Sequence, residues 1–329
     1  MYVFYYNPKM SNKRKVKDTD KLEIVEIPVP KDDHPPSPNI ILPKHEFTMG
    51  LIAPKGAGKT TLMINLLEYY KGYFHTIIVF SPSIKNDPKW EYVKNRDYLV
   101  ENLKLKKFLR KIAEKRKKDV HQVVGPLPTG LEKPLDDALE LGIIDGQKPS
   151  GEDFDPRIPE EYFIDEYSQE GLAEILNEQM AMVRQIEEHG GNKYIANRIL
   201  IILDDLVGSD AFRRNRANPF ISANTNHRHL SLSLLEVVQA YKEFPTTVRR
   251  NWTCIIFFKN FNQHEIDAVL EEYSLGIVDK NERYEIYEYC TKEPHSFLYF
   301  NTQRDPEYRL MRKFDEYLMV GEDDGIRAT

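Results

Sequence analysis

The stretch Ala53–Thr61, with the sequence APKGAGKTT, constrains this chain more than any other feature. It follows a short apolar segment, FTMGLIA (47–53), and leads into TTLMINLLEYYKG, whose apolar residues have helical spacing and which ends at Gly72. The next segment, HTIIVFSPS (75–83), has the pattern of a buried strand that ends in a turn. Strand, glycine loop, helix and strand in this order predict a parallel βαβ unit.

A glycine-rich loop at the start of a helix is suited to binding phosphate. Gly56 and Gly58 let backbone N–H groups approach an anion, Lys59 can reach β- and γ-phosphates, and Thr60 has the hydroxyl that binds Mg²⁺. The usual motif has glycine where this chain has Ala53, but that position is expected at the strand exit, away from the phosphates. We therefore predict a nucleoside triphosphate site formed by Ala53, Pro54, Lys55, Gly56, Ala57, Gly58, Lys59, Thr60 and Thr61.

Two adjacent acids follow a second apolar strand. RILIILDD (198–205) is apolar on both faces, as a central parallel strand should be. Asp204, at the strand end, is predicted to hold Mg²⁺ or its water, and Asp205 to orient the attacking water. DLVG (205–208) also fits the D-x-x-G switch of GTPases, but no N-K-x-D motif follows it. GNKYI (191–195) precedes it and has Ile where Asp is needed, so the sequence favours an ATPase-type site.

The segment HLSLSLLEVVQ (229–239) predicts a further parallel strand. Neighbouring parallel strands end on the same side, so Gln239 should lie near the γ-phosphate and sense it or position water, although a glutamine at a strand end is also ordinary. Arg228 precedes the strand, at the opposite end of the sheet. In a ring it could reach a neighbour's nucleotide as an arginine finger. Arg249 and Arg250 compete for that role, and each arginine alone is also compatible with an ordinary surface position.

The sequence gives little support for a metal site, for nucleophilic catalysis or for disulfides. His227 and His229 flank Arg228, but no Cys or His lies at ligand spacing, which disfavours a zinc site. No G-x-S-x-G or reactive-cysteine context is present. Cys254 and Cys290 are too few for a disulfide framework and fit a reducing setting.

The net charge of −6 gives no global cationic field, although a ring or channel can concentrate basic side chains locally. The N-terminus does not have the pattern of a signal peptide, and no apolar run approaches 18 residues. We therefore expect an intracellular protein that is not secreted and has no membrane span.

The order of segments predicts a polar, proline-rich leader (1–44), an ATPase-type domain (45–320) and a short tail (321–329). Within the domain, residues of about 100–195 form an insertion with a very basic run (104–118) and an amphipathic helix (169–191). TCIIFFKN (253–260) is predicted as a strand and 262–274 as a helix. ERYEIYEYC (282–290) and HSFLYFN (295–301) are expected to pair as antiparallel strands, and EYRLMRKFDEYL (307–318) to form a helix.

Several segments taken together resemble the virion DNA-packaging ATPases of poxviruses and other large DNA viruses, within the FtsK/HerA superfamily. These segments are APKGAGKTT, IIVFSPSIKNDPKW, ILIILDDL, HRHLSLSLLEVVQAYKEFPTTVRRN and the late FLYFN with RKFDEYL. The most specific feature is the strand that begins after Arg228 and ends at Gln239, after the double acid and before FPTTVRRN. The resemblance covers about residues 45–100 and 195–318.

This resemblance implies an α/β fold of the RecA-like P-loop NTPase type, with a mainly parallel central sheet flanked by helices. It implies ATP and Mg²⁺ as cofactors, and a homo-oligomeric ring, expected to be a hexamer. Partners would be double-stranded DNA, contacted through its backbone without sequence specificity, and capsid proteins. The protein would be located in the host cytoplasm, a viral factory or the virion. The family's nucleotide, metal, acid, sensor and finger positions match Lys59, Thr60, Asp204, Asp205, Gln239 and Arg228.

Two alternatives stay open at this stage. One is a cellular or plasmid DNA translocase of the same superfamily. The other is a virion component or DNA-binding scaffold that binds nucleotide and turns it over weakly. The intact Lys59, Thr60 and Asp204 disfavour the second alternative.

Overall fold

The computed structural model describes residues 31–120, 154–206, 209–212, 218–275, 277, 279–320 and 326–328. The chain divides into two units, Met1–Asp32 and Asp33–Thr329, and the architecture below belongs to the second. Most of the predicted leader lies outside the described residues. Its last part is packed, because His34 and Leu42 are both buried.

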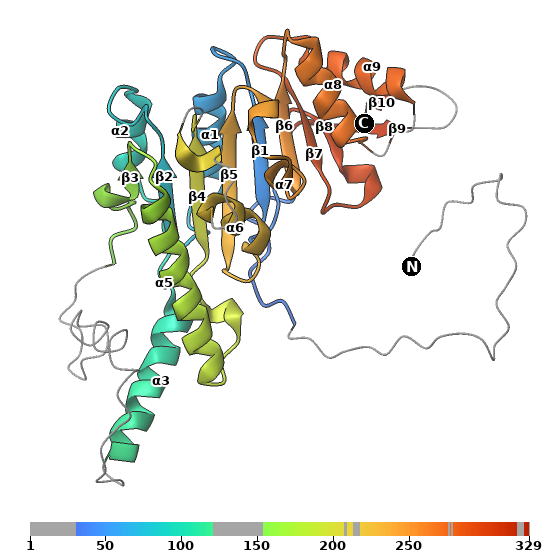
Figure 1. Ribbon diagram of the computed structural model, residues 1–329. Coiled ribbons are helices and arrows are strands. Elements are labelled where there is room, and N and C mark those ends of the chain that lie inside the picture. The colour runs from blue at the N-terminus through green and yellow to red at the C-terminus, as the bar shows by residue number, and fades with distance from the viewer. Residues whose placement is uncertain are drawn as a thin grey trace, which may run out of the picture. The chain divides into compact units, whose positions relative to one another are not determined.

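A ten-stranded sheet forms the centre of this unit (Figure 1). Its strand order is β10-β9-β8-β7-β6-β1-β5-β4-β2-β3. The strands from β6 to β3 are parallel, and those from β7 to β10 are antiparallel to their neighbours. The bounds are β1 Thr48–Ile52, β2 Thr76–Phe80, β3 Phe163–Ile164, β4 Ile199–Asp204, β5 Leu232–Val238, β6 Cys254–Phe258, β7 Phe297–Asn301, β8 Leu310–Arg312, β9 Glu316–Val320 and β10 Ile326–Ala328.

This order confirms the predicted α/β fold of the RecA-like P-loop type. β5 lies between β1, which leads into the glycine loop, and β4, which ends in the acids. Because these strands are parallel, the glycine loop, Asp204 and Gln239 follow or end their strands at the same edge of the sheet. The strand order therefore assembles the predicted site from three separate segments.

Helices cover both faces of the sheet (Figure 1). The bounds are α1 Lys59–Tyr69, α2 Lys89–Lys94, α3 Leu103–Val120, α5 Gln169–Glu188, α6 Pro219–Asn226, α7 Thr246–Arg249, α8 Gln263–Glu272 and α9 Lys280–Thr291. Alternate strand residues face opposite layers, as the two-residue period of a strand requires. In β4, for example, Leu200 and Ile202 pack with α1 and α2, whereas Ile201 and Leu203 pack with α5 to α9.

A close contact in the centre of the sheet explains one glycine. A Cβ atom at Gly50 of β1 would lie 2.2 Å from the Trp252 indole, so no side chain fits there. The indole Nε1 in turn donates a hydrogen bond to Glu236 Oε2 of β5 (2.5 Å), and Asn224 Nδ2 of α6 donates to Oε1 (2.6 Å). Glu236 is thus a buried carboxylate that joins the sheet to α6 and to the segment after α7.

The connection between β2 and β4 contains α3, β3 and α5. The predicted helix at 169–191 is α5, capped by Ser168, whose side chain accepts a hydrogen bond from Gly171 N. The first part of α3 packs on α5 through Leu105, Val183 and Ile186. Within the described part of the chain, no helix is both long and apolar enough to cross a membrane.

The predicted strand at 282–290 is wrong, because this segment lies in helix α9. Its alternating tyrosines and glutamates suggested a strand, but the buried residues are Ile286, Tyr287, Cys290 and Thr291, a helical spacing. Asp279 caps the helix by accepting hydrogen bonds from Asn281 N and Glu282 N. The strand predicted at 295–301 is present as β7, but it pairs with β6 and β8.

The predicted helix at 307–318 is also wrong, because the segment forms most of a β-hairpin, β8 and β9. Lys313, between the two strands, has φ of 53°, a left-handed conformation that ends the strand and reverses the chain. β8 pairs with the side of β7 that does not face β6. Hydrogen bonding to this strand edge, and not local sequence preference, determines the conformation of the segment. The predicted tail contributes β10, which pairs with β9.

Candidate nucleotide-binding site

The glycine loop connects β1 to α1 and has a backbone that requires glycine twice. Gly56 and Gly58 have φ of 82° and 101°, in the left-handed region. Gly58 is the N-cap of α1, and no side chain caps this helix end. The first N–H groups of a helix lack intrahelical acceptors, so this end of α1 offers them to an anion.

Ala53 retains the position that the motif gives to glycine. Its side chain is buried in the core, and its N–H donates to Val238 O of β5 (2.9 Å). The residue therefore belongs to the strand exit, as expected from the sequence. Thr60 lies in the first turn of α1, and Thr61 follows it on the exposed side.

Lys59 lies between the two acids. Its Nζ is 3.5 Å from Asp204 Oδ1 and 3.5 Å from Asp205 Oδ2. The side chains of Lys59 and Asp204 are only 15% and 2% exposed. Neither Lys59 Nζ nor Asp204 Oδ1 has a hydrogen-bond partner, although both atoms are buried. The two atoms form an ion pair at 3.5 Å, but their hydrogen-bonding capacity is unused, and buried polar atoms normally make hydrogen bonds. This pair can therefore accept groups that a ligand would supply.

Burial raises the pKa of Asp204 above its ordinary value, and the Lys59 ammonium and the Ser81 hydroxyl oppose this effect. Ser81 Oγ donates to Asp204 Oδ2 (2.8 Å). This leaves Oδ1 as the carboxylate oxygen that is free to accept another ligand. Ser81 belongs to none of the motifs that predicted the site, but its position just after β2, next to β4, could have indicated it.

Gln239 lies beside Asp205, as the strand-end argument predicted. Its Nε2 donates to Asp205 Oδ1 (2.7 Å). Asp205 has φ of 54°, a left-handed conformation that Asp tolerates better than most residues. Its side chain is 36% exposed, much more than that of Asp204. One acid is therefore enclosed and the other faces outward, with its orientation set by Gln239 and Lys59.

The three arginines differ sharply in their surroundings. Arg228 is exposed and precedes β5, at the end of the sheet opposite to the glycine loop. Arg250 is also exposed. Arg249 is buried: its Nη2 lies 3.0 Å from Glu272 Oε1, and its guanidinium stacks over the Tyr241 ring at 4.3 Å. Arg249 is thus held by contacts within the chain, whereas Arg228 and Arg250 are exposed.

A histidine from the far end of the sequence supports the glycine loop. His295 Nδ1 donates to Ala57 O (2.9 Å), and a Cβ atom on Gly58 would lie 3.1 Å from this nitrogen. His295 itself has φ of 61°. This residue was not predictable from the sequence, because no local motif connects the turn before β7 with the loop after β1.

His227 and His229, considered above as metal ligands, do not face each other in one site. His227 is buried and its Nδ1 contacts Asn224 O (2.9 Å), whereas His229 is exposed. Among the described residues, no group of three or more His, Cys, Asp or Glu side chains is arranged to hold a metal.

Comparison with known families gives one match. The model of the family described as Poxvirus A32 protein matches residues 156–286, a segment that includes β4, β5 and the acids. The chain resembles the poxvirus A32 family. This match confirms the resemblance inferred from the motifs. No curated protein matches the sequence.

The chain also matches solved structures at low sequence identity. The genome packaging NTPase B204 of Sulfolobus turreted icosahedral virus 2, in complex with AMP, has 13% identity and a TM-score of 0.43, covering 78% of this chain and 93% of that one. The cytoplasmic domain of the type VII secretion ATPase EccC of Thermomonospora curvata has 13% identity and a TM-score of 0.36, with 85% and 26% covered. VirB4 of Thermoanaerobacter pseudethanolicus has 13% identity and a TM-score of 0.34, with 78% and 87% covered.

Proposed function

We propose that this protein is an ATPase that translocates double-stranded DNA and packages a viral genome into a preformed capsid. The observation that carries the ATPase part is the buried Lys59 ammonium between Asp204 and Asp205, beside an uncapped helix end. The packaging part is supported by the A32 match over residues 156–286 together with the motifs that resemble packaging ATPases.

The residues of the site fit Mg²⁺ and a nucleoside triphosphate. The buried atoms of the site that make no hydrogen bond are one cation, Lys59 Nζ, and one carboxylate oxygen, Asp204 Oδ1, which form an ion pair with each other. These suit a phosphate oxygen and a divalent cation respectively. Thr60 and Asp204 would hold the metal, which would neutralise developing charge on the phosphoryl group. The N–H groups at the start of α1 would bind the phosphates.

Asp205 and Gln239 would act on water. Asp205 is the more exposed acid, and its carboxylate is fixed by Gln239 on one oxygen and by Lys59 on the other. A carboxylate held in this way can accept a hydrogen bond from water and align it for attack on the γ-phosphorus. Loss of the γ-phosphate would change the surroundings of Asp205 and, through Gln239, of the end of β5.

Arg228 would complete the site of a neighbouring subunit in a ring. It is exposed and lies at the opposite end of the sheet, so it is placed to act outside its own site. A finger arginine is worth roughly 10³–10⁵-fold in rate in related chemistry. The ring, expected to be a hexamer, would contact DNA phosphates in the host cytoplasm or viral factory and dock on capsid proteins. The exposed lysines in the first part of α3, such as Lys107 and Lys111, are candidates for the DNA contact.

The decisive experiment measures phosphate release from ATP by the purified protein with and without linear duplex DNA. We expect stimulation by DNA that weakens as salt rises, and its loss in Lys59→Ala and in Arg228→Ala. Mixing these two variants should restore part of the activity, because one can supply the finger and the other the intact site. Lys71→Ala, an exposed lysine just beyond α1, is the matched control and should behave as wild type.

Each alternative predicts a different result. ATP binding without DNA-stimulated turnover would contradict the motor and favour a scaffold that binds nucleotide. If DNA stimulates the wild type but mixing the two variants restores no activity, the protein is still an ATPase. Arg228 then does not act as a finger in a neighbouring subunit. Genome packaging is tested separately, by asking whether a virus that carries Lys59→Ala assembles particles that lack DNA.

A further inference from the structure

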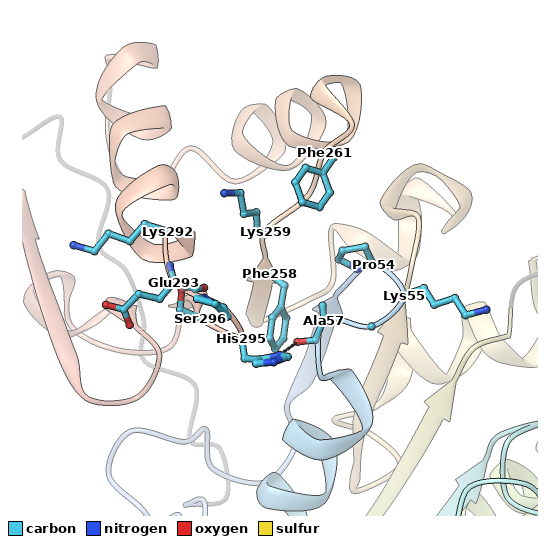
Figure 2. A pocket seen from close by; sticks show the side chains of 12 residues that line it. Pro54, Lys55, Ala57, Phe258, Lys259, Phe261, Lys292, Glu293, His295 and Ser296 are labelled. Atoms are coloured by element: carbon cyan, nitrogen blue, oxygen red, sulfur yellow. Dashed lines mark hydrogen bonds between the residues drawn. The ribbon is translucent and has the colours of Figure 1, made fainter.

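The turn before β7 contacts the backbone of the glycine loop through one side chain, His295. Figure 2 shows the His295 ring directed at Ala57, with a dashed line from the ring to the Ala57 carbonyl oxygen. His295 Nδ1 lies 2.9 Å from this oxygen. A carbonyl oxygen can only accept a hydrogen bond, so Nδ1 must carry the proton and donate it.

This hydrogen bond fixes the direction of one peptide group, the one between Ala57 and Gly58. The described part of the chain contains no cis peptide bond. In a trans peptide group, the carbonyl oxygen and the N–H of the following residue point in opposite directions. The Ala57 oxygen points to His295, so the Gly58 N–H points away from it.

Lys59 and the acids lie on the other side of β1 from His295. In the sheet order, β7 and β6 flank β1 on one side, and β5 and β4 flank it on the other. Asp204 ends β4, and Lys59 Nζ, from the residue after Gly58, lies 3.5 Å from Asp204 Oδ1. A phosphate bound beside Lys59 would therefore meet a Gly58 N–H that is turned away from His295.

Glycine alone would let this peptide group rotate. Gly58 has φ of 101°, and glycine adopts positive and negative φ at similar cost. The two neighbouring peptide groups have bonds of their own, because Ala57 N donates to Pro54 O (3.2 Å) and Gly58 O accepts from Leu62 N (3.0 Å). Neither bond holds the peptide group between Ala57 and Gly58. Its rotation would present a carbonyl oxygen to the phosphate in place of an N–H donor.

The turn that carries His295 is itself closely held. Ser296 Oγ donates to Glu293 O (2.7 Å) and accepts from Glu293 N (3.2 Å), which closes the turn. The Glu293 carboxylate lies 2.6 Å from Arg312 Nη2 of β8. The imidazole is thus presented to the glycine loop by the last strands of the sheet, which are distant from the loop in the sequence.

We propose that His295 is a positioning residue for phosphate binding. It holds the peptide group between Ala57 and Gly58 in the orientation that lets the Gly58 N–H donate to a phosphate of the nucleotide. His295 acts through the loop backbone and does not itself bind the nucleotide. This inference rests on the proposed nucleotide-binding function of the glycine loop.

The test measures dissociation constants for ATP with Mg²⁺ and for inorganic tripolyphosphate by calorimetry, using the full chain. His295→Gly removes the donor, and glycine tolerates the φ of 61° at this position. We expect this variant to bind both ligands about 3- to 10-fold more weakly, which is the effect of roughly one hydrogen bond.

His295→Asn is the conservative variant that should rescue binding. Asparagine tolerates left-handed φ, and its Nδ2 is as many bonds from Cβ as the Nδ1 of histidine, so it can donate to Ala57 O. Its affinities should lie within about 2-fold of wild type, because the hydrogen bond is kept. His189→Gly, which removes an exposed histidine at the end of α5, is the matched control and should change neither affinity.

Steady-state turnover gives a second measurement. In His295→Gly the KM for ATP should rise by about the same 3- to 10-fold, while kcat stays within about 2-fold of wild type. The reason is that the lost contact binds the phosphates in the ground state and in the transition state alike. A loss of kcat at unchanged KM would overturn the assigned role.

The other outcomes also overturn the inference, and they differ from one another. Unchanged affinity in His295→Gly, with or without a lower urea midpoint, would leave His295 a structural contact only. An equal loss in His295→Gly and His295→Asn would exclude the donor role. Weaker ATP with unchanged tripolyphosphate would mean that His295 acts on the nucleoside. If the wild type binds neither ligand, the proposed function itself fails, and this inference fails with it.

Discussion

The two ends of the parallel sheet differ in how their buried polar side chains are paired. At the carboxyl end, Lys59 Nζ and Asp204 Oδ1 are buried without hydrogen-bond partners. At the amino end, several buried polar side chains bond to one another. His45 Nδ1 and Nε2 contact Ser233 Oγ (2.8 Å) and Ser231 Oγ (3.0 Å), so both ring nitrogens are engaged.

His75 and Arg198 complete the amino end. His75 Nδ1 accepts a hydrogen bond from Arg198 N (2.8 Å), and the Arg198 guanidinium donates to Tyr73 O (2.9 and 2.6 Å). His75 and Arg198 directly precede β2 and β4. Their side chains form hydrogen bonds with backbone N–H and C=O groups near the starts of these strands, which would otherwise lack partners. The comparison indicates that the amino end stabilises the fold, whereas the carboxyl end is kept incomplete for a ligand.

The substitution Asp204→Asn, at the carboxyl end, is the strongest test of this difference between the two ends. We expect ATP turnover to fall by about 10²-fold or more, since a group that stabilises charge at the reacting phosphate is removed. The urea midpoint should stay the same or rise, because a neutral isostere relieves the cost of burying the carboxylate while Lys59 Nζ keeps its pair with Asp205 at 3.5 Å. Turnover assays and urea unfolding on one preparation test both parts.

Asp165→Asn is the matched control for this prediction. Asp165 is an exposed acid at the far edge of the sheet that pairs with Lys85, and surface pairs contribute little to stability. It should leave both turnover and the midpoint unchanged. A clear loss of stability in Asp204→Asn would contradict the view that this end is built for a ligand at the expense of the fold.

The common location of these residues was predictable from the sequence because they lie in short motifs joined by one topological rule. The glycine loop, Asp204 and Gln239 each end or follow an apolar segment, and parallel strands bring such ends together. The strand that separates β1 from β4 was not deducible by spacing alone, but its presence does not change which edge the residues share.

The parts that escaped prediction depend on contacts distant in the sequence. His295 contacts Ala57 across 238 positions, and nothing local marks it. The segments at 282–290 and 307–318 were assigned the wrong conformation because their local patterns are ambiguous. For β8 the deciding factor is the free edge of β7, and for α9 it is the set of buried residues on one helical face.

Glu236, halfway along β5, offers a second way to sharpen the comparison. Burial raises its pKa to about 7, from 4.5, against the hydrogen bonds of Asn224 and Trp252. As pH rises from 4.5 to 7 the unfolded chain loses this proton first, so stability contributed by the protonated group is lost across that window. Relative to wild type, Glu236→Gln should therefore gain up to about 3 kcal/mol in unfolding free energy between pH 5 and pH 8.

Urea unfolding of both proteins at the two pH values measures this gain. The glutamine amide can be satisfied if Asn224 turns its Oδ1, which has no partner, toward it. Glu161→Gln, an exposed substitution, should show no pH-dependent difference. An equal effect of Glu236→Gln at both pH values would mean that the carboxylate stays ionised in the fold.

The smallest expected effect tests the amino end. Burial, and then the nearby Arg198 charge, lowers the pKa of His75 to about 3, from 6.5. As pH falls below 6.5 the unfolded chain binds the proton first, so stability is lost, by about 1.4 kcal/mol at pH 5.5. His75→Asn keeps an acceptor for Arg198 N but cannot titrate, so its unfolding free energy should fall less between pH 7.5 and pH 5.5.

This variant also completes the contrast with Asp204→Asn, because ATP turnover at pH 7.5 should be unaffected when the far end of the sheet is altered. His264→Asn, an exposed histidine on α8, serves as the control and should keep the wild-type pH dependence. If His75→Asn lowers turnover as strongly as it changes acid stability, the two ends are coupled through β2 and β4. The division between a hydrogen-bonded cluster that stabilises the fold and an incomplete end that binds a ligand would then be wrong.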